Sequence, residues 1–213
     1  MTSASQAGCD DNRMDNSERM QQGLVYDPNE PGLASDQEAA LELLYDFNAT
    51  RPSQSAERSE LLQRMFGAIG DDCYIEPPLH ANWAGRNAYF GRGIYANFNL
   101  TLVDDGDIHV GDNVMFGPNV VVATAGHPIL PELRAKGLQF NLPVRIGRNV
   151  WIGGGAQIMP GVTIGDDTVI GAGSVVTRDI PSGVVAVGVP CRVVREINDH
   201  DREFYWHDRR LDL

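Results

Sequence analysis

One histidine of this chain is placed where it could do acid–base chemistry. His127 opens the segment HPILPELRAKGLQFNLP (127–143) and is followed at once by Pro128. An unperturbed imidazole titrates near neutral pH, so it can take a proton from a hydroxyl as a general base. The alternative is that His127 only caps a corner of the backbone through a hydrogen bond. Whether His127 acts as a base or only caps a corner depends on the elements that position this segment.

The remaining histidines and the cysteines do not form a pattern typical of a metal site. Zinc sites need several ligands that converge, and no two histidines here stand at short spacing within the repeat region. Three widely separated cysteines without a CxxC pair argue against a disulfide framework and predict a reducing, cytoplasmic environment. We therefore expect no metal, and we expect Cys191 to pack rather than to act as a nucleophile. The residues in question are His80, His109, His127, His200, His207, Cys9, Cys73 and Cys191.

A six-residue period defines the scaffold around His127. Every sixth residue over the last third of the repeat region is a β-branched aliphatic, and most are followed by glycine. A period of six fits neither a helix nor a flat alternating strand. It is typical of a parallel β-helix, whose stacked coils share one core. The series is Ile146, Ile152, Ile158, Ile164, Ile170 and Val176.

The period also runs through an earlier set, Val110, Phe116 and Val122. From Val122 to Ile146 is 24 residues, or four periods, so the segment 127–143 interrupts the coil without changing its phase. We interpret it as an excursion loop that leaves and re-enters at one corner. Because a regular β-helix only scaffolds, function must come from such departures, and the loop with His127 is the largest.

The rest of the chain divides by composition. Ser35 to Glu38 forms a capping-box pattern that predicts the start of one helix, and a second apolar run ends at Gly70. We expect a mainly β protein, a left-handed parallel β-helix of hexapeptide repeats with a small helical cap. The expected parts are a disordered tail (1–19), the cap (20–73), the β-helix with its loop (74–197) and a C-terminal tail (198–213).

Overall composition excludes several kinds of partner. The net charge of −12 disfavours nucleic acid and anionic membranes. No apolar run is long enough to span a bilayer, and the N-terminus lacks the apolar core of a secretory signal. We expect a cytoplasmic protein that binds neither nucleic acid nor membrane.

Several motifs together resemble one family of enzymes. The runs ANFNLTLVDD (96–105), AGHPILPELR (125–134), NVWIGGGAQIMPGVTIGDDTVIGAGSVVTRDIP (149–181) and GVPCRVVREI (188–197) are similar to the galactoside and maltose O-acetyltransferases. These belong to the hexapeptide-repeat acyltransferases. The resemblance spans roughly residues 20–200 and is strongest for galactoside O-acetyltransferase.

The resemblance implies a homotrimer with acetyl-CoA lying in a groove between adjacent β-helices. The family's catalytic histidine corresponds to His127. It would deprotonate a sugar hydroxyl as that oxygen attacks the thioester, then return the proton to the CoA thiolate. No covalent acyl-enzyme is implied.

The resemblance also implies the acceptor residues Asp27, Asn97 and Asp105, and it places Asn82 near a serine that contacts substrate in the family. Carboxylates and amides bind sugar hydroxyls because they accept hydrogen bonds. From the residues alone, Asp105 could instead be a turn residue and Asn97 a corner asparagine. The surrounding segment 79–91 departs from the family pattern, which leaves the identity of the sugar open.

The residues implied for acetyl-CoA lie near the end of the repeats: Gly154, Ala172, Thr177, Arg178, Arg192 and Arg195. Between residues 176 and 195 the three arginines face only one acid, Asp179, and this local positive charge suits a phosphorylated ligand. They could also be solvated surface arginines. Gly154 stands where galactoside enzymes have a serine, so any oxyanion donor there must be a backbone N–H.

Three other functions remain open. The first is transfer of acetyl to an antibiotic or other xenobiotic hydroxyl by the same fold. The second is a zinc carbonic anhydrase on a β-helix, which the histidine spacing disfavours. The third is a catalytically silent scaffold, against which the intact His127 loop argues.

Overall fold

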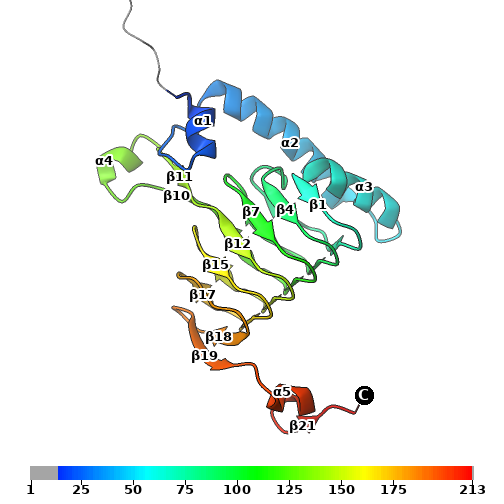
Figure 1. Ribbon diagram of the computed structural model, residues 1–213. Helices are drawn as coiled ribbons and strands as arrows, with labels where there is room; N and C mark the ends of the chain where they lie inside the picture. The colour runs from blue at the N-terminus through cyan, green and yellow to red at the C-terminus, as the bar shows by residue number, and fades with distance from the viewer. Residues whose placement is uncertain (1–13, 213) are drawn as a thin grey trace, which may run out of the picture.

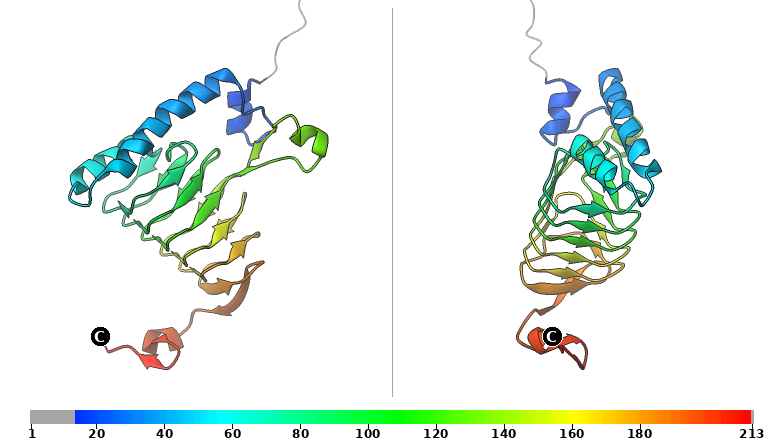
Figure 2. Two further views of the ribbon diagram at one scale, coloured as in Figure 1. Left: turned by 180° about the vertical axis from the view of Figure 1, so that it is seen from behind. Right: turned by 90° about the vertical axis from the view of Figure 1, so that its right-hand side faces the viewer.

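Most of the chain winds into a three-sided prism of stacked coils (Figures 1 and 2). The computed structural model describes residues 14–212. The faces of the prism are three β-sheets in which neighbouring coils pair in parallel. The expected parallel β-helix is therefore confirmed.

The strands sort into the three faces as follows. The first sheet holds β1 (Ala68–Ile69), β4 (Ala88–Phe90), β7 (Ile108–Val110), β12 (Val144–Ile146) and β15 (Thr163–Ile164). The second holds β2 (Tyr74–Ile75), β5 (Tyr95–Ala96), β8 (Met115–Phe116), β13 (Trp151–Ile152), β16 (Val169–Ile170), β18 (Val184–Val187) and an antiparallel last strand, β19 (Arg192–Glu196). The third holds β3 (His80–Ala81), β6 (Thr101–Val103), β9 (Val121–Ala123), β14 (Gln157–Ile158) and β17 (Val175–Val176).

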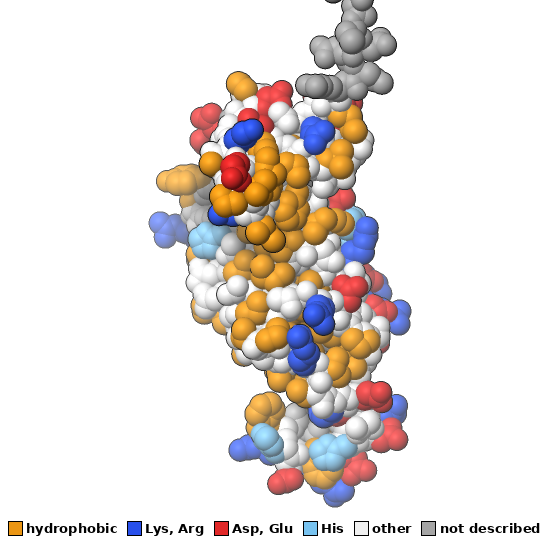
Figure 3. All heavy atoms as spheres, turned by 90° about the vertical axis from the view of Figure 1, so that its left-hand side faces the viewer, with side chains coloured by type: hydrophobic (Ala, Val, Ile, Leu, Met, Phe, Trp, Pro, Cys, Tyr) orange, Lys and Arg blue, Asp and Glu red, His pale blue; other side chains and the backbone are white. Residues whose placement is uncertain are grey.

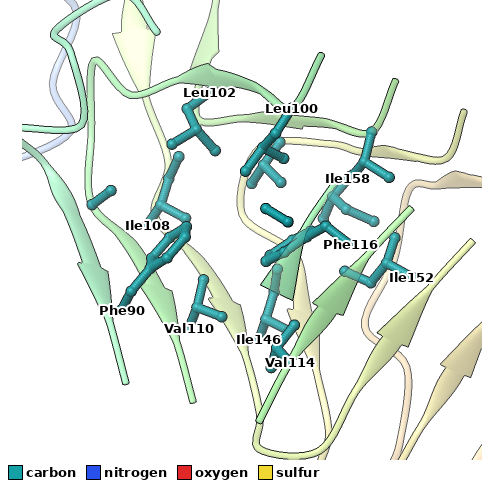
Figure 4. Packing of buried hydrophobic residues seen from close by; sticks show 14 of the residues in the cluster. Phe90, Leu100, Leu102, Ile108, Val110, Val114, Phe116, Ile146, Ile152 and Ile158 are labelled. Carbon is teal, nitrogen blue, oxygen red and sulfur yellow. The ribbon is translucent and has the colours of Figure 1, made fainter. Parts of the chain in front are cut away.

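The six-residue period points one aliphatic side chain inward on each face. Val110, Ile146 and Ile164 lie in register on the first sheet, and each is nearly or fully buried. The same holds for Phe116, Ile152 and Ile170 on the second sheet. Figure 4 shows four of these side chains, Val110, Phe116, Ile146 and Ile152, packed in the interior of the prism. Stacking identical inward positions gives one continuous apolar core.

Two corners of the prism matter for the site. We call the corner between the third and first sheets the histidine edge; it contains residues 82–87, 104–107, 124–143, 159–162 and 177–179. We call the corner between the second and third sheets the glycine edge; it contains residues 76–79, 97–100, 117–120, 153–156 and 171–174. Along the chain, each coil passes the glycine edge, the third sheet and then the histidine edge.

The excursion loop leaves the prism from the histidine edge. It is built from a short antiparallel pair, β10 (Ala125–Gly126) with β11 (Phe140–Asn141), and one helical turn, α4 (Pro131–Arg134). Arg145 pairs with Thr163, 18 residues further on, whereas His109 pairs with Arg145, 36 residues further on. The loop thus adds a second full coil length, which is why the phase survives.

The N-terminal part differs from the expected disordered tail and helical cap. Residues 1–13 of the expected tail lie outside the described residues, but α1 (Asn16–Gln21) covers part of the segment expected to be disordered. Asp15 caps that helix, accepting from the Glu18 N–H at 2.8 Å while Glu18 accepts from the Asp15 N–H at 3.3 Å. This reciprocal capping box satisfies two end donors and stabilises a short helix.

The cap helices also begin and end elsewhere than predicted. Helix α2 (Pro31–Ala49) starts at Pro31 rather than at Ser35, because proline is preorganised for the first helical position. Helix α3 (Ser55–Met65) ends before Gly70, and β1 then pairs with β4. The β-helix therefore begins within the range 20–73 assigned to the cap.

The C-terminal tail is also folded. Helix α5 (His200–Glu203) is followed by a hairpin of β20 (Phe204–Trp206) and β21 (Arg209–Arg210). This unit projects beyond the last coil (Figure 1). None of the helices in residues 14–212 combines the length and apolar character that crossing a bilayer requires.

Candidate active site on two edges of the prism

His127 lies at the start of the excursion loop with one ring nitrogen engaged. Its Nδ1 is 2.9 Å from the backbone oxygen of Leu138, across the antiparallel pair that closes the loop. A carbonyl oxygen can only accept, so Nδ1 donates, and the neutral ring carries its lone pair on Nε2. The residue is exposed. The hydrogen bond thus orients the ring and leaves Nε2 free to accept a proton.

Asp105 lies on the same edge, one coil earlier, and is the centre of a polar network. Its Oδ2 accepts from Asn82 Nδ2 at 2.8 Å, and its Oδ1 accepts from Gln139 Nε2 at 3.1 Å. Its backbone oxygen accepts from Asn141 Nδ2 at 2.8 Å. Asp105 is 9% exposed, so the carboxylate is held among hydrogen-bond donors with a small part of its surface open. Asn82 and Asp105, two of the predicted acceptor residues, are therefore in direct contact in the structure.

Asp27 lies beside this network without joining it. Its Oδ1 accepts from the N–H and from Nδ2 of Asn29, both at 3.0 Å. The preceding residue, Tyr26, pairs its backbone with Gln139 in both directions, at 2.9 and 3.0 Å. Asp27 is thus fixed next to the returning arm of the loop, with its second carboxylate oxygen unengaged among the described residues.

Asn97 lies on the other edge of its coil. It belongs to the glycine edge, whereas Asp105 follows on the histidine edge after the intervening strand β6. Its Oδ1 accepts from the Phe98 N–H at 2.8 Å, the local bond expected of a corner asparagine. Among the described residues no hydrogen bond joins Asn97 to Asn82, Asp105 or His127. Within one chain, Asn97 therefore lies apart from the other predicted acceptor residues.

The predicted acetyl-CoA residues are divided between the same two edges. Gly154 and Ala172 stack on the glycine edge, whereas Thr177 and Arg178 lie on the histidine edge. Ala172, Thr177 and Arg178 are exposed. Within residues 14–212 neither a hydrogen bond nor an ion pair engages the Arg178 guanidinium.

The glycine edge is smooth because its coils touch backbone to backbone. A Cβ at Gly153 would lie 2.5 Å from the Ala172 nitrogen, and one at Gly154 would lie 3.1 Å from the Pro118 oxygen. A side chain at Gly153 would collide with this backbone, whereas one at Gly154 would require Pro118 to shift by a few tenths of an ångström. The Gly153 N–H bonds to Ile170 and the Gly155 N–H to Pro118, but the Gly154 N–H has no partner among the described residues. This edge therefore presents two backbone N–H groups, those of Gly154 and Ala172, that no described residue accepts from.

The last two arginines lie on β19 and differ from Arg178. Nη1 of Arg192 donates to the Cys191 oxygen at 2.7 Å. Arg195 holds Asp201 of α5 through two hydrogen bonds of 2.7 Å each. This bidentate pairing lowers the pKa of the Asp201 carboxyl to about 2. Of the three arginines, Arg195 is the one that forms an ion pair with a carboxylate among the described residues.

Four residues of the site escaped prediction from sequence: Tyr26, Asp104, Gln139 and Asn141. The Asp104 carboxylate is fully buried and accepts from the N–H groups of Trp83 at 2.8 Å and Gly85 at 2.9 Å, so it anchors the turn that follows Asn82. Burial raises the pKa of Asp104 to about 6 despite these bonds. The paired aspartates in VDD were the available signal. Nothing in the loop sequence singled out Gln139.

A cavity of about 160 Å³ reaches Asp105 from the side of α1. Trp83 and Asn141 also line it, whereas His127 and Asp27 do not. The base itself therefore lies on the open surface of one chain rather than in a closed pocket.

The histidines do not converge on a metal site in this chain. His109 stacks on Tyr89 at 4.9 Å on the first sheet and lies 3.6 Å from Asp107, well apart from the loop that carries His127. Within residues 14–212 no three His, Cys, Asp or Glu side chains gather in a way suited to a metal ion.

Hydrophobic side chains form a broad band on the face drawn in Figure 3, with Lys or Arg side chains lower down towards the C-terminal hairpin. On the second sheet, the outward residues of four successive coils are Tyr74, Tyr95, Met115 and Trp151, and each is between 40% and 49% exposed. The corresponding positions of the first sheet are Tyr89, His109, Arg145 and Thr163. A continuous exposed apolar stripe of this kind marks a surface for association.

Comparison with known proteins agrees with the fold. The maltose acetyltransferase hexapeptide capping motif matches residues 19–70, and the bacterial transferase hexapeptide of six repeats matches residues 143–178. The chain is 52% identical to the galactoside O-acetyltransferase of Lactococcus lactis over 201 residues, covering 94% of this chain and 97% of the relative.

Two solved structures are also similar. A galactoside acetyltransferase in complex with coenzyme A superposes with a TM-score of 0.91 at 46% identity, covering 94% of this chain and all of the other. An acetyltransferase of Vibrio cholerae complexed with acetyl coenzyme A gives 0.80 at 31% identity, covering 87% of this chain and all of the other.

Fold and site together define a hexapeptide-repeat acetyltransferase. Within that class, the chain belongs to the galactoside O-acetyltransferase family.

Proposed function

We propose that this protein transfers the acetyl group of acetyl-CoA to a hydroxyl of a galactoside-type sugar, with His127 as general base. The observation that carries the proposal is the bond between His127 Nδ1 and the Leu138 oxygen, which leaves Nε2 as the free acceptor. The names of the relatives supply the substrate class: galactoside O-acetyltransferase, and galactoside acetyltransferase with coenzyme A.

The proposed reaction needs one base and one oxyanion donor. Nε2 of His127 removes the proton of the sugar hydroxyl while that oxygen attacks the thioester carbonyl carbon. The oxyanion that forms can accept from the unpartnered Gly154 N–H. When the tetrahedral intermediate collapses, the carbon–sulfur bond breaks and the imidazolium returns its proton to the CoA thiolate. The ester is formed directly, without an acyl-enzyme.

Asp105, Asn82 and Asp27 would bind the remaining sugar hydroxyls. Asp105 uses one lone pair of each carboxylate oxygen internally and has capacity left for hydroxyl donors. The exposed Arg178, together with Arg192, supplies positive charge for the phosphates of CoA in a chain of net charge −12.

We further propose that the working enzyme is a homotrimer whose sites lie between subunits. His127 and Asp105 lie on the histidine edge, but Asn97, Gly154 and Ala172 lie on the glycine edge, across the third sheet. A neighbouring prism can place its glycine edge against the histidine edge of the first. The exposed apolar stripe of the second sheet supports such packing. Cyclic symmetry would then create three equivalent sites.

The direct test measures acetyl transfer by His127→Ala with acetyl-CoA and a panel of galactosides. The release of free CoA thiol reports the rate. We expect kcat to fall about 10²- to 10⁴-fold, the usual contribution of a positioned general base, with the KM for acetyl-CoA little changed. His109→Ala is the matched control, because His109 lies on the outer face of the first sheet. Near-normal turnover by His127→Ala would overturn the proposal.

A further inference from the structure

Two consecutive residues of the returning loop arm form hydrogen bonds with the proposed base, His127, and with the proposed acceptor residue, Asp105. The backbone oxygen of Leu138 accepts from His127 Nδ1 at 2.9 Å. The side chain of the next residue, Gln139, donates from Nε2 to Asp105 Oδ1 at 3.1 Å. A shift of this dipeptide would therefore move the proposed base and the acceptor carboxylate together.

The dipeptide is itself clamped by Tyr26 of the N-terminal segment. Tyr26 and Gln139 exchange two backbone hydrogen bonds, and Gln139 Nε2 donates to the Tyr26 hydroxyl at 2.7 Å. Tyr26 is 2% exposed and Gln139 is 9% exposed, so water competes little for these bonds. Desolvation raises the pKa of Tyr26 to about 12, and the phenol stays neutral beside Asp105.

The donor inventory of Gln139 shows what its side chain does. A carboxamide nitrogen has two hydrogens, and here they serve the Tyr26 hydroxyl and the Asp105 carboxylate, with the Asn141 Oδ1 at a longer 3.3 Å. No donor is left over for a sugar. Asp105 is in turn fixed at both oxygens, by Gln139 at Oδ1 and by Asn82 at Oδ2.

We propose that Gln139, clamped by Tyr26, is a positioning residue that sets the carboxylate of Asp105 relative to His127 and thereby determines acceptor binding. This inference rests on the proposed transferase function. It assigns to the loop a second role besides carrying the base, since the same strand aligns the acceptor with it.

The test compares steady-state kinetics of Gln139→Leu, Tyr26→Phe and the double variant. Leucine is similar in size to glutamine and has no donors. We expect Gln139→Leu to raise the KM for the sugar about tenfold, the size of one hydrogen bond to a charged group. The KM for acetyl-CoA should stay unchanged. Tyr26→Phe should give a smaller rise, and the double variant should add little to Gln139→Leu, because the shortest hydrogen bond of the Tyr26 hydroxyl, at 2.7 Å, is the one from the Gln139 amide, whereas its bonds with Asn141 are 3.3 and 3.5 Å long.

Gln139→Glu provides a readout that a purely structural role would not move. A carboxylate at position 139 would lie beside Asp105, so the two groups would share a proton. We expect the sugar KM of this variant, relative to that of the wild type at the same pH, to improve as the pH falls. Gln63→Leu is the control, because its amide bonds the Ile69 oxygen on the far side of the cap.

The outcomes separate the two proposals. If the wild type transfers acetyl but Gln139→Leu keeps a normal sugar KM, the positioning role is wrong. It is also wrong if Gln139→Leu raises the KM of both substrates alike while the thermal midpoint drops. If the wild type transfers no acetyl to any sugar, the proposed function itself fails.

Discussion

The histidine edge and the glycine edge are corners of the same coils, yet they are built in opposite ways. The histidine edge carries the longest insertion and a network of buried polar side chains, with Asp104 and Asp105 at 0% and 9% exposure. In its last two coils the glycine edge is nearly bare, because a side chain at Gly153 would collide with the backbone of the next coil. One edge holds chemical groups in fixed positions, and the other offers a smooth surface.

The difference indicates how a repetitive scaffold acquires a site. Groups that must be oriented, such as the His127 ring, need hydrogen bonds from outside the repeat, here from Leu138. A surface that only has to fit a long ligand can be left regular. In the proposed homotrimer, each chain would carry half of a site on each edge, and a neighbouring chain would supply the other half. The predictions below test this division, beginning with the largest effect.

The largest effect is expected when two inactive variants are mixed. His127→Ala removes the base from the histidine edge, and Ala172→Trp blocks the glycine edge at an exposed position. If each site combines edges of two chains, randomly mixed trimers regain activity at about a quarter of their sites, as expected for a cyclic head-to-tail interface. The measurement is acetyl transfer after denaturation and joint refolding.

The control pairs two lesions on one edge, His127→Ala with Asp105→Asn. Every site in such a mixture lacks one group, so no activity should return. Recovery in this pair, or its absence in the first pair despite mixed trimers of two differently tagged chains, would contradict the division into two edges.

Asp104 should make the histidine edge respond to pH. Burial raises its pKa from the ordinary 3.8 to about 6 in the folded protein, so folding favours the protonated form. Stability from this group is present below pH 4 and is lost as the pH rises through 6. The loss is about 3 kcal/mol, since one unit of pKa corresponds to about 1.4 kcal/mol. In Asp104→Asn the group no longer titrates.

The measurement is the thermal midpoint of both proteins between pH 4 and pH 7. We expect the wild type to lose stability relative to Asp104→Asn across that interval. A gap that stays constant with pH would show that Asp104 titrates normally in the folded protein.

The smallest effect concerns the arginines expected to meet CoA. Arg178→Ala should raise the KM for acetyl-CoA about tenfold, since its guanidinium is free to bind a phosphate. Arg195→Ala should change that KM less, because Arg195 is paired with Asp201. The comparison uses initial rates at varied acetyl-CoA, with Asp201→Asn as the variant that releases Arg195. Equal effects of the two alanine variants would mean that the Arg195 pairing opens at little cost.

The β-helix was predictable because single residues at a regular spacing identify each of its coils. Ile152, Ile158 and Ile164 each face the core at a fixed spacing, and the spacing alone predicts the turn of the backbone. The in-phase gap before Ile146 likewise predicted a loop at one corner, and His127 lies at its start as the sequence indicated.

The polar network was not predictable because its partners are far apart in the chain. Gln139 bonds Asp105, 34 positions away, and Tyr26, 113 positions away. No local pattern reports such pairs. The resemblance to the family identified Asp105 and Asn82, but not the residues that hold them. The start of α2 is ambiguous in the sequence for a different reason: Pro31 and the capping pattern at Ser35 both suit the first turn of a helix, and the structure has the helix begin at Pro31.

The length of the excursion loop has a consequence for how this protein can change. Each coil pairs only with its neighbours, and β12 pairs with β7 across the insertion as if the loop were absent. Closing a longer loop costs little entropy, about 0.6 kcal/mol for each doubling. The part of the loop between Pro128 and Gly137, which leaves His127, Leu138 and Gln139 in place, can therefore be exchanged among relatives, or redesigned, while the prism folds as before. Selection for a new acceptor can therefore change this one insertion while the residues that form the β-helix stay the same.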